Sequence, residues 1–85
     1  MTDAFQAAQR AAGVIAAKHR GDFAGAEALL ASFPDEAGKT RGFCLLAELA
    51  LSLVRTHTGQ SMDELVQELT LLMESVELPP GAEAA

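Results

Sequence analysis

The chain has 85 residues, enough for one small domain that folds without a disulfide or a metal. A net charge of −6, with six Lys and Arg scattered among twelve Asp and Glu, excludes nucleic acid and anionic membranes as expected partners. The single cysteine excludes an intrachain disulfide. No secretory signal pattern opens the sequence, and no apolar stretch reaches the ~20 residues that span a bilayer, so we expect a cytoplasmic protein.

The composition favours helices. Hydrophobic residues make up 49% of the chain, and its four aromatic residues are all Phe. A core built from Leu, Val, Ala and Phe is typical of a helical bundle. We therefore predict an all-α fold, a compact antiparallel bundle in one domain over 1–78, with a flexible tail over 79–85. Its four helices are expected at 3–20, 22–33, 41–58 and 62–76.

The first helix, 3–20, has short oxygen-bearing side chains at its start and a glycine after its end. Thr2 or Asp3 can cap the free N–H groups of the first turn, and Gly21 suits the C′ position. The 3.6-residue period puts Val14 away from the core face. The residues expected on that face are Phe5, Ala8, Ala12, Ile15, Ala16 and His19.

The second helix, 22–33, has Asp22 as its N-cap and ends before Pro34, because the residue before a proline is pushed out of the helical region. The connection to the first helix is only two residues long and predicts an antiparallel hairpin or a sharp corner. A loop is expected over 34–40, within which residues 35–39 can form a helical turn.

The third helix, 41–58, is apolar around most of its circumference and requires neighbours on most sides. Glu48 either shares a thin exposed stripe with Ser52 and Arg55 or sets the register of an interface with a partner's arginine, and the wheel favours the stripe. The candidate interface residues are Phe43, Leu45, Leu49 and Leu53, with Val14 and Leu71 from other helices that lie off their core faces.

The fourth helix, 62–76, opens with the S-x-x-E pattern of a capping box, formed by Ser61 and Glu64. Its acidic face is either solvated, the more common case, or binds a cation or a basic protein. The apolar face comprises Leu65, Val66, Leu69, Leu72, Met73 and Val76, whereas Leu71 lies among the acids.

Few residues suggest chemistry. His19 and His57 lie near helix C-termini, and with Asp22 they could bind a metal, although the helix dipole is the stronger explanation for histidines at such positions. Cys44 lies near the predicted start of the third helix, where the dipole favours a thiolate, but it also borders an apolar face, and a free cysteine is more often a small hydrophobic residue. No catalytic residues can be assigned and no cofactor is expected, because nucleotide-binding, hydrolase and calcium-loop motifs do not occur in the sequence. We therefore expect a protein without enzymatic activity.

Two stretches resemble known helical proteins. The segment GDFAGAEALL, Gly21 to Leu30, resembles the opening of a tetratricopeptide-like hairpin, although the Trp, Tyr and Pro positions of that repeat do not occur. More broadly, residues 5–76 resemble small all-helical proteins of high-GC actinobacteria that have no assigned function. This resemblance rests on capping and core positions, so it implies a fold and no chemistry.

The apolar surplus of the third helix predicts a protein–protein interaction module that self-associates as a homodimer. The alternatives are a monomeric adaptor with a groove for a partner helix, or a small metal or ligand site near His19 and His57.

Overall fold

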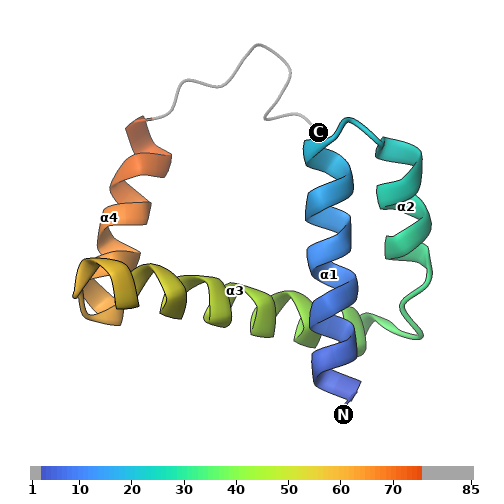
Figure 1. The fold of residues 1–85 in the computed structure, drawn as a ribbon, viewed down its shortest axis with the longest axis horizontal. Coiled ribbons are helices and arrows are strands. Elements are labelled where there is room, and N and C mark those ends of the chain that lie inside the picture. The colour runs from blue at the N-terminus through green and yellow to red at the C-terminus, as the bar shows by residue number, and fades with distance from the viewer. Residues whose placement is uncertain (1–2, 76–85) are drawn as a thin grey trace. The chain divides into compact units, whose positions relative to one another are not determined.

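The computed structural model describes residues 3–75, and within that range it contains four α-helices and no strand (Figure 1). The all-α prediction is confirmed, and three of the four helices lie close to their predicted bounds. The helices are α1 (Asp3–His19), α2 (Phe23–Ala31), α3 (Glu36–Thr58) and α4 (Met62–Ser75). The predicted final residue of the fourth helix, at position 76, and the predicted tail lie outside the described residues.

The chain forms two compact units, Met1–Ala50 and Leu51–Ala85. The first unit holds α1, α2 and the first part of α3, and the second holds the end of α3 and α4. The single domain over 1–78 stays a prediction.

Helices α1 and α2 form an antiparallel hairpin, one of the two arrangements that the short connection predicts (Figure 1). Gly21 adopts φ +81°, and its N–H donates to Lys18 O at 3.0 Å while the N–H of Asp22 donates to Ala17 O at 2.9 Å. This Schellman pattern ends α1. The Asp22 carboxylate then accepts from the N–H of Gly25 at 2.9 Å, which caps α2. Both predicted signals at this turn are confirmed.

The buried face of α1 is a row of small residues, Ala8, Ala11, Val14 and Ala17. The prediction that Val14 points away from the core is wrong, because its side chain is only 2% exposed. Phe5 and Ile15, expected on the core face, are about half exposed. The spacing of these two large side chains determines the predicted face. The observed contact face consists mainly of alanines, whose small side chains let the helices approach closely.

The core of the first unit is small. It consists of Ala11, Val14 and Ala17 from α1 with Ala26 and Phe33 from the α2 region. Partly buried residues pack around it: Ala7, Leu29, Leu30, Phe43 and Leu46.

Phe33 joins the three helices of the first unit. Its ring lies 6.1 Å from that of Phe43 on α3, and the guanidinium of Arg10 on α1 lies 5.5 Å from its centroid. Arg10 also donates to Ser32 O at 3.2 Å, so a cation occupies the C-terminal end of α2, where the helix dipole favours it.

Helix α3 begins at Glu36, five residues before the predicted start. Asp35 acts as its cap, because its Oδ1 accepts from the N–H of Gly38 at 2.6 Å, and Lys39 Nζ pairs with Glu36 Oε1 at 2.9 Å. Most of the predicted 34–40 loop is therefore helix. The apolar pattern that set the prediction starts only at Gly42, whereas the helix starts at its polar cap.

Gly42 marks a close approach of α3 to α1, which the first part of α3 crosses instead of lying antiparallel beside it (Figure 1). A Cβ at this position would lie 2.6 Å from the backbone oxygen of Ala7 and 2.8 Å from its carbonyl carbon. No side-chain rotation relieves a clash with backbone, so the contact requires glycine.

In the second unit, Gly59 (φ +76°) ends α3, with its N–H donating to Arg55 O at 2.8 Å. The capping box is confirmed: the N–H of Ser61 donates to Glu64 Oε1 at 2.8 Å, and the N–H of Glu64 donates to Ser61 Oγ at 3.1 Å. These hydrogen bonds lower the pKa of the Glu64 carboxyl. Leu65, one residue further on, is buried.

We expect Gly42→Ala to lower the free energy of unfolding by about 1–2 kcal/mol, because overpacking against backbone outweighs the gain of about 1 kcal/mol in helix propensity. Denaturant unfolding followed by circular dichroism measures the change. Thr40→Ala, at an exposed position of the same helix, is the matched control and should leave stability equal or slightly higher. Equal stability of Gly42→Ala and Thr40→Ala would contradict the close approach.

The capping box should make the stability of the fold depend on pH in the acidic range. Because the folded pKa of Glu64 is lowered, its contribution is complete above the unfolded pKa of about 4.3 and is lost as the pH falls through the folded value. Glu64→Gln should therefore flatten the decline of the thermal midpoint below about pH 5. Glu74→Gln, outside the capping box, should keep the wild-type slope. Parallel curves for wild type and Glu64→Gln would contradict the prediction.

Candidate functional site

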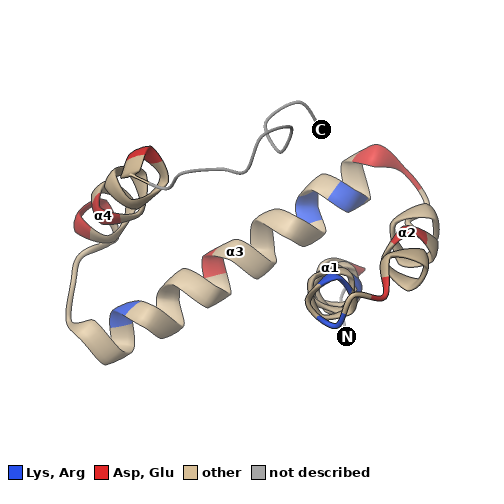
Figure 2. Ribbon diagram, turned by 90° about the horizontal axis from the view of Figure 1, so that it is seen from above, with Lys and Arg blue, Asp and Glu red and all other residues tan. Residues whose placement is uncertain are grey.

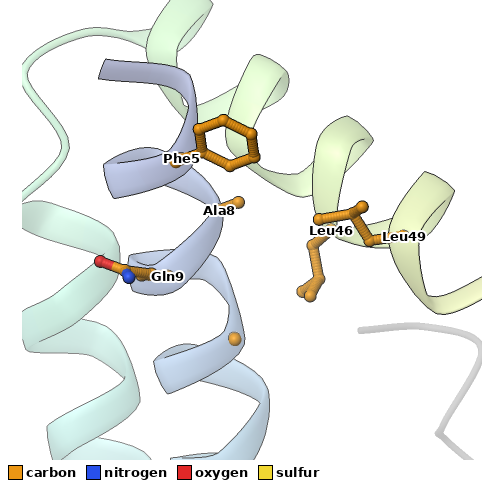
Figure 3. A pocket seen from close by; sticks show the side chains of 6 residues that line it. Phe5, Ala8, Gln9, Leu46 and Leu49 are labelled. Carbon is orange, nitrogen blue, oxygen red and sulfur yellow. The ribbon is translucent and has the colours of Figure 1, made fainter. Parts of the chain in front are cut away.

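An open apolar groove lies between α1 and α3 within the first unit (Figure 3). Its volume is about 440 Å³, and Gln9 contributes the one polar side chain of its lining. Phe5 and Ala8 project from α1 toward Leu46 and Leu49 on α3 (Figure 3). The lining residues are Phe5, Ala8, Gln9, Ala12, Leu46 and Leu49.

The groove arises from the mixture of side-chain sizes along its walls. Ala8 and Ala12 lie four residues apart on α1, so they follow each other on one face and leave a hollow between the larger residues. Phe5 and Leu49 at its edges are 49% and 50% exposed. Large apolar side chains that stay half in water beside a concave apolar surface are typical of a place where another molecule binds.

The predicted interface residues have different positions in the structure. Phe43 and Leu45 are half-buried, Leu49 lines the groove, and Val14 belongs to the core. In the second unit, Leu53 and Leu71 are 62% and 58% exposed.

Sequence reasoning missed the contribution of α1 to the groove. The 3.6-residue period identifies Phe5, Ala8 and Ala12 as one helical face but assigns that face to the core, whereas the three residues line the groove. Their spacing identified a shared face correctly and carried no information on what covers it.

Cys44 and Glu48 form a contact on the exposed side of α3. Cys44 Sγ donates to Glu48 Oε1 at 3.5 Å, and this hydrogen bond, together with the negative charge of Glu48, raises the pKa of the Cys44 thiol. The expectation of a dipole-stabilised thiolate is therefore wrong. Helix α3 starts at Glu36, so Cys44 lies beyond the first turn, where the dipole acts. The exposed stripe is confirmed for Glu48 and Ser52, whereas Arg55 is half-buried and donates to Gln60 O at 3.2 Å.

The three candidate metal ligands are divided between the units. His19 and Asp22 belong to the first unit and His57 to the second. Among residues 3–75, no group of three or more His, Cys, Asp or Glu side chains is arranged to hold a metal ion.

Comparisons with protein-family models, curated proteins and solved structures find no match for this chain. The resemblances to a tetratricopeptide-like hairpin and to small actinobacterial helical proteins therefore stay predictions. In the part of the chain that the structure describes, no helix has the length and apolar character needed to cross a membrane.

The Cys44–Glu48 contact predicts slow thiol chemistry. Alkylation by iodoacetamide between about pH 7 and 9 should be faster in Glu48→Gln than in wild type, because removing the carboxylate lowers the thiol pKa and raises the thiolate fraction. The apparent pKa obtained from the alkylation rate against pH should therefore be lower in Glu48→Gln than in wild type. Glu27→Gln is the control, because it removes a carboxylate from another helix, α2, and it should follow the wild-type profile. A Glu48→Gln profile that overlies wild type would show that the contact does not govern the thiol.

Proposed function

We propose that the chain is a non-enzymatic helical interaction module that self-associates as a homodimer through α3 and the α1–α3 groove. The observation that carries the proposal is the groove itself, an apolar hollow with half-exposed Phe5 and Leu49 at its edges. In a two-fold dimer the same patch is buried on both copies, so each apolar residue of the patch contributes twice to the buried apolar area.

Helix α3 supplies one wall of this surface. Leu46 and Leu49 lie three residues apart, a spacing that places them on one helical face, and Leu49 is 50% exposed. An interface that buries about 500 Å² of apolar surface per copy releases roughly 12 kcal/mol per copy. Over both copies the gross gain is roughly 24 kcal/mol, which exceeds an association cost of about 4–15 kcal/mol, so self-association is energetically feasible.

A second candidate uses the same groove in a monomer, as an adaptor that receives the apolar face of a partner helix. The groove volume of about 440 Å³ favours the adaptor as much as the homodimer, because apolar walls accept large apolar side chains from a second copy or from another protein. The solution mass separates the two candidates.

Light scattering across a dilution series from high to low micromolar should give a mass near twice 8.9 kDa at the concentrated end, falling toward 8.9 kDa on dilution. Leu49→Gln should shift this transition to higher concentration by about ten-fold or more, because it places a polar group in the apolar contact. Circular dichroism verifies that the variant keeps its helices.

Phe23→Gln is the matched control, since Phe23 is 63% exposed and does not line the groove. It should keep the wild-type dilution curve. A wild-type mass of 8.9 kDa at every concentration would contradict self-association and favour the adaptor. Equal effects of the two substitutions would show that the groove is not the contact.

A further inference from the structure

Helix α4 carries an apolar stripe that its own unit covers only in part. Leu65 is buried and Leu69 is half-buried, so the stripe packs inward at these positions. Val66, Leu72 and Met73 are 45%, 54% and 70% exposed. At 100° per residue, all five fall within one arc of about 120°, so the exposed residues extend the same face that Leu65 and Leu69 bury.

The stripe is bordered by carboxylates. Over Met62–Ser75 the helix has four acidic residues and neither Lys nor Arg, and every charged residue on α4 in Figure 2 is acidic. The helical period places Asp63 and Glu74 on one side of the stripe, and Glu64 and Glu68 on the other. Glu64 is held ionised by the capping box, and Glu68 Oε2 accepts from Gln60 Nε2 at 3.2 Å.

This charge pattern selects the occupant. Pairing with α4 of a second copy would align carboxylates with carboxylates along the whole seam, a like-charge arrangement that opposes association. Nucleic acids and anionic membranes are repelled for the same reason. A helix of another protein with apolar residues at three- and four-residue spacing and Lys or Arg on both flanks matches the stripe and its borders together.

We propose that Val66, Leu72 and Met73 form a docking surface for a basic amphipathic helix of a different protein. The apolar contacts supply affinity, and the acidic borders set orientation and speed the encounter. Met73, the most exposed of the three, has an unbranched and polarisable side chain that adapts to differently shaped partners. The surface lies entirely in the second unit, so it is independent of the α1–α3 groove.

The probe is a synthetic helical peptide of about 18 residues, or five turns, with Leu at three- and four-residue spacing and Lys on both flanks. Two comparison peptides carry the same Leu pattern with Glu in place of Lys, or the same composition in scrambled order. Titration of labelled peptides with the full chain, followed by fluorescence anisotropy, should give saturable binding of the Lys peptide. We expect binding about ten-fold weaker or worse for both comparison peptides.

The variants Leu72→Gln and Met73→Gln should each weaken binding of the Lys peptide by about ten-fold. Leu71→Gln is the matched control, because Leu71 is 58% exposed on the same helix but lies on the opposite side from the stripe. It should change affinity by less than about two-fold. All three positions are exposed, and circular dichroism confirms that the helices are retained.

Four results would overturn the proposal. Equal binding of the scrambled peptide would show attraction by charge alone. A loss of affinity in Leu71→Gln equal to that in Leu72→Gln and Met73→Gln would show that the stripe is not the contact. Tight binding of the Glu peptide would remove the role of the acidic borders. A Leu72→Gln variant that changes the solution mass and leaves peptide binding intact would identify a second copy as the occupant. Failure of the groove variant Leu49→Gln to alter the mass bears only on self-association, because Leu49 is absent from this surface.

Discussion

Close packing of small residues is the constraint on which the first unit depends. Ala11 and Ala17 are almost completely buried on α1, and Gly42 brings α3 against the backbone of Ala7. Contacts of this kind let helix backbones approach closely, but they bury little apolar area per residue. A core built in this way leaves the larger side chains near its edge. Phe5 and Leu49 are half exposed for this reason, and the groove lies between them.

Local signals in the sequence predicted the helices well, because each depends on a few neighbouring residues. Gly21, Asp22 and the Ser61–Glu64 capping box all form the hydrogen bonds that their chemistry predicts. The contact face of α1 was predicted incorrectly, since periodicity weights large side chains and Val14 packs among alanines. The groove could not be predicted at all, because it depends on where α3 crosses α1, and no local pattern encodes that crossing.

Charge is distributed unevenly along the chain. Residues 1–50 contain five Lys or Arg and six Asp or Glu, whereas residues 51–85 contain one Arg and six Asp or Glu. The single Arg of the second part, Arg55, is half-buried and donates to the backbone of Gln60. Few positive charges within the second unit therefore offset the negative charge of the α4 carboxylates. Their electrostatic field extends about one Debye length, ~8–10 Å, into solvent.

The two exposed apolar surfaces consequently differ in what they select. The groove in the first unit is lined by apolar atoms and one amide, so shape and burial govern its occupant. The α4 stripe is narrow and bordered by carboxylates on both sides, so a ligand of matching shape is rejected unless it also carries positive charge. If both proposals hold, the chain binds a copy of itself through the groove of the first unit and a basic helix through the stripe of the second. The two equilibria then respond differently to salt, because screening weakens the charged contact and leaves apolar burial largely intact.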